Sequence, residues 1–321
     1  MTRSTASSKT VGPTAELHPD QPHPDHKAAL AALPPERVAD WARTSNGPGL
    51  IRLLSHCAAL AIAGALVLNA TGPAQLAAQA LLGVFLTFLF APLHECIHRT
   101  AFRSRWLNDT VAEVCGFVML LPPRRFRFFH FAHHRHTQDP EKDPELARPK
   151  PATWPAYLWA LTGWAYWSGQ IRSLLGAALG APLPDYVPAR AAGRVRWEAR
   201  AHLVGYLVVA ILSVMSGSTL ALTLWVVPAL LGQPWLRAYL LAEHTACPLV
   251  PDMLQNTRTT FANRLIRWFA WEMPSHTAHH ALPQTPFHRL PEVTEALRPN
   301  LRSTAKSYPD AHRQILASFH R

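Results

Sequence analysis

The residues most able to carry chemistry in this sequence are its histidines, which number 18 in 321 residues. Eight of them form three short clusters, His94-Glu95-Cys96-Ile97-His98, His130-Phe131-Ala132-His133-His134 and His276-Thr277-Ala278-His279-His280. Histidines three or four residues apart share one face of a helix. Neutral imidazole binds iron, zinc, copper and nickel, and eight imidazoles exceed what one ion accepts. The clusters therefore predict at least two metal ions and leave the element open.

His244 is a ninth candidate ligand, because it follows a predicted membrane span and would reach the same face as the three clusters. His136 lies two residues after His134 and would point elsewhere on a helix, and His288 lies in a predicted loop, so both are left out. The four cysteines form no CxxC pair, which argues against a thiolate site. The predicted ligand set is His94, His98, His130, His133, His134, His244, His276, His279 and His280.

Five carboxylates lie close in sequence to these histidines. A carboxylate that accepts the ring N–H of a ligand histidine fixes its orientation and raises its basicity. The alternative for each is ordinary solvation at the surface. The five candidates are Glu95, Asp139, Asp143, Glu243 and Glu272.

The composition is that of a membrane protein. Hydrophobic residues make up 49% of the chain and charged residues 16%, against about 25% charged in soluble domains. Four apolar runs are candidate membrane spans, and the first two are each near the ~20 residues that span a bilayer. They form two predicted hairpins, Leu53–Ala70 with Ala74–Leu93, and Ala201–Met215 with Thr219–Trp235. The expected fold is therefore all-α, with four membrane spans and a helical cap that carries the histidines.

Charge predicts the topology. Both hairpin turns are uncharged, whereas many arginines lie in residues 94–200, so the positive-inside rule places this region, the termini and the active site on the cytoplasmic side. The shorter apolar stretches Val111–Leu121 and Trp154–Leu179 are expected at the interface, although a further span is the alternative. Basic residues outnumber acidic ones by 31 to 20. Arginines interleaved with phenylalanines at 124–129 fit anionic headgroups better than nucleic acid.

The chain divides into three predicted regions. Residues 1–48, rich in Pro, Ser, Thr and Ala, are expected to be a disordered cytoplasmic tail whose His18, His23 and His26 are solvated. Residues 49–295 form the membrane domain, and residues 296–321 a polar cytoplasmic tail without recognisable chemistry.

The three histidine clusters resemble the histidine boxes of the membrane fatty-acid desaturases. The flanking motifs are similar to bacterial members: His134-Arg135-His136-Thr137 with Asp139-Pro140-Glu141, Asn256-Thr257-Arg258-Thr259, Met273-Pro274 and Pro286-Phe287-His288. The resemblance covers roughly residues 50–295.

This resemblance implies a di-iron enzyme that uses O2 and two external electrons to remove hydrogens from an unactivated acyl chain. It implies a fatty acyl substrate carried as lipid, acyl-CoA or acyl carrier protein, and a location in the bacterial inner membrane. The sequence contains no motif typical of a haem, flavin or iron–sulfur module, so the electrons are expected from a separate protein such as a ferredoxin or rubredoxin.

Two other functions remain open at the level of sequence. Histidine boxes fix the metal and not the fate of the substrate, so a hydroxylase or another oxygenase of lipid, alkane or carotenoid substrates is the nearest alternative. A zinc transporter or sensor fits less well, because transport sites place ionisable residues inside the spans. Here only His56 and His202 fall within a predicted span, each near its cytoplasmic end.

Overall fold

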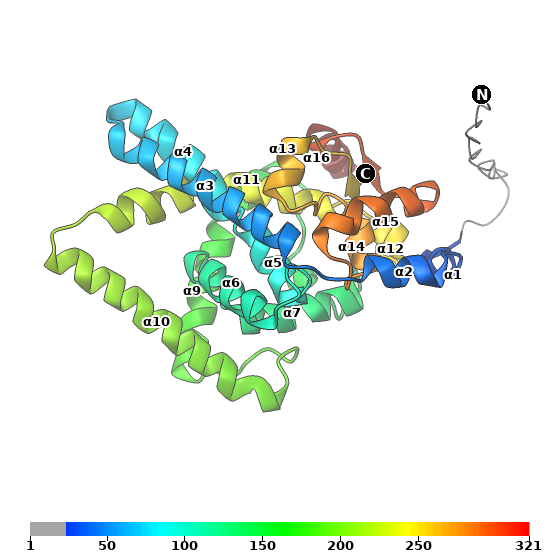
Figure 1. Cartoon of the computed structure of the whole chain (residues 1–321), viewed down its shortest axis with the longest axis horizontal. Coiled ribbons are helices and arrows are strands. Elements are labelled where there is room, and N and C mark those ends of the chain that lie inside the picture. Colours follow the sequence, from blue (N-terminus) through cyan, green and yellow to red (C-terminus); the bar gives the residue numbers. More distant parts are fainter. Residues whose placement is uncertain (1–23, 321) are drawn as a thin grey trace, which may run out of the picture.

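The computed structural model describes residues 24–320, which are mostly helical (Figure 1). The helices are α1 (His26–Ala31), α2 (Pro35–Trp41), α3 (Gly47–Asn69), α4 (Gly72–Thr87), α5 (Phe90–His98), α6 (Arg105–Val118), α7 (Pro123–His136), α8 (Trp154–Leu161), α9 (Trp164–Leu179), α10 (Ala192–Met215), α11 (Val227–His244), α12 (Met253–Asn256), α13 (Arg264–Phe269), α14 (His276–Ala281), α15 (Leu290–Leu297) and α16 (Tyr308–Ala317). Single 3-10 turns lie at Pro144–Ala147, Ala189–Ala191, Phe287–Arg289, Arg298–Asn300 and Ser318–His320, and a π-helical turn lies at Leu222–Val226. Strands β1 (Thr259–Thr260) and β2 (Thr304–Ala305) pair in parallel.

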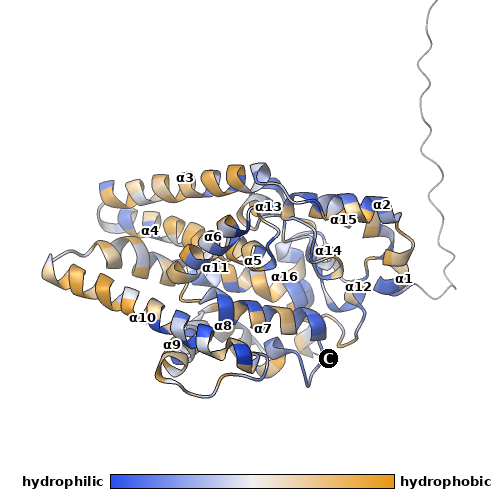
Figure 2. Cartoon of the chain, turned by 60° about the horizontal axis from the view of Figure 1, so that its bottom comes forward, coloured by the Kyte–Doolittle hydropathy of each residue, from blue (hydrophilic) through white to orange (hydrophobic). Residues whose placement is uncertain are grey.

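Three helical stretches of the described chain are long and apolar enough to cross a membrane: Gly47–Asn69, Gly72–His98 and Ala189–Met215. Large apolar side chains along α3 and α10 are exposed, as expected of helices that face lipid. Figure 2 shows α3 and the C-terminal half of α10 as predominantly hydrophobic. The second stretch runs through α4 into α5, so the first histidine box forms the C-terminal end of this stretch.

The run predicted as a fourth span, Thr219–Trp235, is not among these three stretches. It contains the π-helical turn and the first half of α11, where the polar Gln233 and the internal Pro234 interrupt the apolar sequence.

Helix α11 packs against α4, at a point where two glycines meet. A methyl group added to Gly83 would collide with the carbonyl of Pro228, and one added to Gly232 would collide with the carbonyl of Gly83. Small residues allow such close backbone approach between apolar helices. Helix α10 packs instead on α9, around Leu174 and Ala199, and diverges from α11 after the turn at Gly217 (Figure 1). The second predicted hairpin is therefore splayed.

The two stretches predicted at the membrane interface form α6 and the pair α8 and α9. Trp154, Trp159 and Trp164 are exposed on the latter pair. Tryptophan favours the headgroup level of a bilayer, and the interfacial position of these helices stays a prediction.

The expectation of a disordered tail over residues 1–48 is wrong for residues 24–48, and residues 1–23 lie outside the described part. Helices α1 and α2 pack on the C-terminal region, where the fully buried Trp41 donates to Glu292 Oε2 at 3.1 Å. His26, expected to be solvated, contacts Asp252 through its backbone N–H at 2.9 Å. An apolar core anchor and specific polar contacts order this segment.

The C-terminal segment is likewise part of the folded core over its described residues. Leu297, Ala311 and Ile315 are completely buried, and β2 pairs with β1. The segment expected as a polar helix or loop contains helix α16, and its buried side chains pack into the fold. Three buried side chains in a polar sequence give little signal of hydrophobic periodicity.

Candidate metal centre

Four helices supply the nine predicted ligands. Helix α5 carries the first box and α7 the second, α14 carries the third, and α11 ends at His244. Prolines at the start of α7, Pro122 and Pro123, fix its first turn. Before α14 the chain turns through two left-handed residues, Trp271 (φ 47°) and Glu272 (φ 61°). The ends of these four helices bring together histidines separated by more than a hundred residues in sequence.

A first group of five imidazoles draws on all three boxes. It consists of His94, His98, His130, His134 and His279, whose ring nitrogens lie within 4.8 Å of one another. The Nε2 atom of His134 lies 2.9 Å from His130 Nε2 and 3.1 Å from His279 Nε2. An imidazole nitrogen carries one proton or one lone pair and cannot hydrogen-bond to both neighbours in its ring plane. Three converging Nε2 atoms are what ligands of one ion would present.

In a second group of imidazoles, ring nitrogens also converge. His133, His244 and His280 offer nitrogens within 4.8 Å of one another. The Nε2 atom of His244 lies 3.2 Å from His133 Nε2 and 3.1 Å from His276 Nε2. The ring of His276 lies 4.6 Å from that of His280, between centroids. The structure therefore brings all nine predicted ligands into two adjacent groups.

Burial makes these imidazoles suitable metal ligands. Desolvation, followed by repulsion from neighbouring histidines, lowers the pKa of His130, His134 and His279 well below its ordinary value, and does the same for His280. The rings are therefore neutral and have a lone pair to offer. Within residues 24–320, His98 Nε2 and His280 Nε2 are buried without a hydrogen-bond partner. Such orphaned nitrogens are costly unless something binds them, so the residues present fit a metal cofactor.

Three histidines of the second group, His133, His244 and His280, are oriented through their Nδ1 atoms. Asp143 lies 3.0 Å from Nδ1 of His133, and the carbonyl of Asn256 lies 3.1 Å from Nδ1 of His244. A partner at Nδ1 fixes the tautomer that leaves Nε2 free for a metal. The third such contact joins Thr137 Oγ1 and His280 Nδ1 at 3.2 Å. Glu243 Oε1 lies 3.5 Å from Nδ1 of His276 and forms no hydrogen bond with it.

Of the five predicted carboxylates, two face ligand histidines and three contact other residues. Asp143 and Glu243 face ligand histidines. Glu95 accepts instead from Thr100 Oγ1 at 2.7 Å, because the residue next to His94 points to another side of α5.

Asp139 and Glu272 also contact other residues. Asp139 accepts from the backbone N–H of Glu141 in the turn after α7. Glu272 forms ion pairs with Arg52 at 3.3 Å and Arg267 at 2.6 Å. The expectation that these carboxylates and Glu95 would orient ligand histidines is not met by their geometry.

Two orienting groups were missed by sequence reasoning. Thr137 lies one helical turn after His133, a spacing that could have identified it. The Asn256 contact uses a backbone carbonyl, which no residue pattern reveals.

The residues left out of the predicted set lie outside both groups in the described chain. These include His136, His288 and all four cysteines. Cys96 is buried inside the first box, yet its sulfur belongs to neither group.

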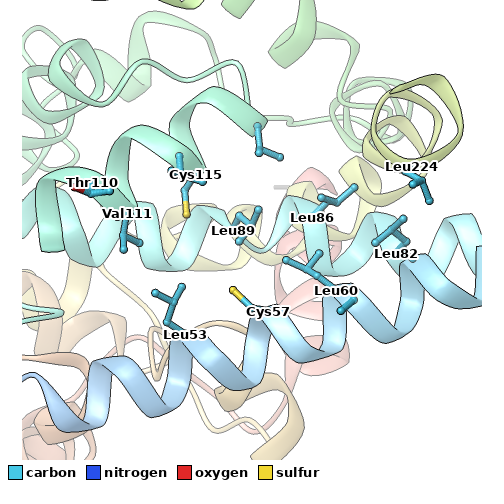
Figure 3. Close-up of a pocket in the computed structure, with 14 residues that line it drawn as sticks. Leu53, Cys57, Leu60, Leu82, Leu86, Leu89, Thr110, Val111, Cys115 and Leu224 are labelled. Carbon is cyan, nitrogen blue, oxygen red and sulfur yellow. The ribbon is translucent and has the colours of Figure 1, made fainter. Parts of the chain in front are cut away.

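An apolar cavity of about 580 Å³ has Leu89, the residue before α5, in its lining (Figure 3). Its walls come from α3, α4 and α6, and include Leu53, Leu86 and Leu89. The next residue after Leu89 is Phe90, whose ring stacks on that of His94 with centroids 5.9 Å apart. A second ring, Phe126, lies 5.6 Å from Phe90 and 5.5 Å from His130. Phe90 and Phe126 thus pack directly against two candidate ligands, His94 and His130.

The described chain thus combines three candidate spans with two buried imidazole groups that could each hold a metal ion. The chain belongs to the fatty acid desaturase family, because the model described as "Fatty acid desaturase" matches residues 71–311. Members of that family are oxidoreductases.

Named relatives align over short stretches only. The chain is 31% identical over 98 residues to an sn-1 oleoyl-lipid 12-desaturase of Picosynechococcus, a stretch that covers 28% of each protein. It is 31% identical over 96 residues to the Synechocystis protein of that name, covering 28% of this chain and 27% of the relative. It is 40% identical over 68 residues to the fatty acid conjugase FAC2 B of Calendula officinalis, covering 21% and 18%. The matched stretches thus span under a third of these relatives.

Proposed function

We propose that this protein is an O2-dependent fatty acyl desaturase that binds two iron ions through its nine clustered histidines. The observation that carries this proposal is the convergence of Nε2 atoms in two adjacent groups, on a scaffold of the fatty acid desaturase family. The proposed reaction converts a CH2–CH2 unit, O2, two electrons and two protons into a CH=CH unit and two molecules of water.

The iron ions, when bound, would supply the oxidising power that breaks unactivated C–H bonds, which no side-chain acid or base can do. His94, His98, His130, His134 and His279 would hold one ion, and His133, His244, His276 and His280 the other. Asp143 orients His133 by accepting its Nδ1–H. All these ligands are nitrogen donors, a set that suits iron but does not by itself distinguish it from zinc or copper.

The substrate tail is proposed to occupy the apolar cavity. Its lining is almost entirely hydrocarbon, with Thr110 as the main polar side chain. A volume of about 580 Å³ lies within the range of ligand pockets, roughly 300–1,000 Å³. Phe90 and Phe126 would keep water from the chain where it passes toward the histidines.

The orientation in the membrane is part of the proposal. Four spans, with α11 as the fourth, would place the histidine groups in a cytoplasmic cap of a bacterial inner membrane. The support is the positive-inside distribution of arginines over residues 94–200. The acyl group would be carried by a lipid, coenzyme A or acyl carrier protein, and a ferredoxin or rubredoxin would deliver the two electrons.

Elemental analysis combined with turnover tests this function. Protein purified from iron-replete cells is expected to contain two irons per chain, and to form an unsaturated acyl product only with O2 and an electron donor. The variant Cys96→Ser should keep the metal, because Cys96 lies outside both groups. Zinc alone, with no activity after addition of iron, would contradict the proposal. A hydroxylated product that retains oxygen from O2 would replace desaturation by hydroxylation.

A further inference from the structure

The segment Asn256–Thr259 contacts three of the four helices that supply candidate ligands. It begins at the last residue of α12, which lies beside α14 in both views (Figures 1 and 2). All four of its residues are buried, with exposed fractions of 3% or less. All four are polar or charged, and two of them, Asn256 and Arg258, bear directly on the end of α11, at His244. The inference that follows rests on the proposed metal-binding function.

Arg258 binds the C-terminal end of α11. Its guanidinium donates to the carbonyl of Ala242 at 2.6 Å and to that of Thr245 at 2.9 Å. Its backbone N–H donates to the carbonyl of Glu243 at 2.8 Å. The last carbonyls of a helix lack partners within the helix and carry partial negative charge. Arg258 therefore satisfies carbonyls on both sides of His244 with one rigid, cationic fork.

Asn256 controls the ring of the same histidine. Its carbonyl accepts from Nδ1 of His244 at 3.1 Å, which leaves Nε2 without a proton and directed at the second group. The side chain of Asn256 holds this carbonyl in place by donating to the carbonyls of Thr137 at 3.1 Å and Val250 at 2.9 Å. Two residues apart in sequence, Asn256 and Arg258 thus fix the ring and the backbone of one ligand.

The same segment is tied to the third box. Thr277, between His276 and His279, donates through its hydroxyl to the carbonyl of Thr257 at 2.8 Å. The backbone N–H of Thr260 donates to the carbonyl of Pro274 at 3.0 Å. A displacement of the segment would therefore alter the distance between His244 and His276, whose Nε2 atoms are 3.1 Å apart.

We propose that Arg258 is a positioning residue of the second histidine group, which acts by locking the C-terminal end of α11 so that His244 can bind a metal ion together with His133, His276 and His280. Arg258 touches no proposed reacting atom and exerts its effect through His244. Loss of its contacts releases the helix end and loosens one metal ion, while the first group keeps its ligands.

The test compares metal retention in purified Arg258→Met and wild-type proteins during dialysis against a graded series of chelator concentrations. Methionine has a similar reach and no donor. Removal of an orienting contact costs about 10–100-fold in metal affinity, so one ion per chain should be lost at 10–100-fold less chelator and the other at the wild-type concentration. The matched control is Arg200→Met, because Arg200 donates to Ala178 O at the end of α9, a helix without ligands. This control should retain metal like the wild type.

A double variant separates positioning from general structural support. Because Arg258 acts through His244, Arg258→Met added to His244→Ala should cause no further loss of metal, a non-additivity expected of coupled residues. An additive loss, or equal loss of both ions, would contradict the proposal. Arg258→Lys keeps the charge and one possible contact, so it should restore part of the metal retention. If Arg258→Met does not accumulate as folded protein, the metal retention of Arg258→Lys is compared with that of the wild type instead.

Failure of the positioning role of Arg258 can be distinguished from failure of the proposed metal-binding function. A wild-type protein that binds metal, together with an Arg258→Met variant of unchanged chelator resistance, would overturn the positioning role alone. A wild-type protein without bound metal would overturn the proposed function, and the positioning role with it.

Discussion

Asp143 and Asp139 lie four residues apart and offer a sharp test of how the second histidine group is held. The Asp143 carboxylate accepts from His133 Nδ1 at 3.0 and 3.1 Å and from the backbone N–H groups of Gln138 at 2.8 Å and Glu145 at 2.9 Å. In Asp143→Asn one oxygen becomes an NH2 group that faces donors, so the charged hydrogen bond to His133 is lost.

The expected magnitude follows from the kind of contact removed. Hydrogen bonds to charged groups contribute about 1.5–3 kcal/mol, and a tenfold change in affinity corresponds to about 1.4 kcal/mol. Asp143→Asn should therefore weaken one metal site by roughly 10–100-fold, in line with other carboxylates that orient metal-bound histidines.

Competition against a chelator of known affinity measures this change. Asp139→Asn is the control, because within residues 24–320 Asp139 contacts its own turn and Lys142, at 3.6 Å, and no ligand histidine. This variant should behave like the wild type. The reasoning is refuted if Asp143→Asn binds metal as tightly as the wild type, or if both variants lose affinity equally.

Three further predictions address the ligands, the helix packing and the effect of pH. His134→Ala or His279→Ala should abolish activity while His136→Ala retains much of it, in assays on membranes with matched protein levels; the reverse pattern would show a wrong ligand set. Gly232→Val should lower the free energy of unfolding by roughly 1–3 kcal/mol through overpacking against α4. Gly193→Ala should not, because no described atom lies within 4 Å of the added carbon. Thermal unfolding in detergent measures both variants, and equal stabilities would contradict the close packing. Metal-free protein should lose stability as pH falls below about 6.5, the ordinary histidine pKa, because burial lowers the pKa of six clustered histidines and only the unfolded chain then takes up protons. These six are His130, His134, His244, His276, His279 and His280. A melting temperature that is unchanged between pH 7.5 and 5.5 would contradict their neutral burial.

The histidine groups could be anticipated from sequence because their spacing is local. A separation of three or four residues places side chains on one helical face whatever the tertiary structure. Sequence also identified His244, since its position at the end of an apolar run carries topological information. The division of nine ligands into groups of five and four was not predictable, because it depends on how α5, α7, α11 and α14 meet.

Which carboxylates contact ligand histidines could not be predicted from the sequence. Proximity along the chain favoured Glu95 and Asp143 equally, yet only Asp143 reaches a ligand ring, because a loop returns it to α7. The N-terminal segment was misjudged for a related reason. A single buried Trp41 and a few contacts such as His26 with Asp252 order a polar segment that has no hydrophobic periodicity.

The most direct test of the central claim is the fatty acid profile of bacterial cells that express the wild-type protein under an atmosphere of ¹⁸O2, compared with cells that express His279→Ala. The account predicts a new unsaturated acyl chain, two hydrogens poorer than its precursor and free of ¹⁸O, in the wild-type cells only. An acyl product that contains ¹⁸O, or identical profiles from the two proteins when both are present at equal levels in the membrane, would contradict it.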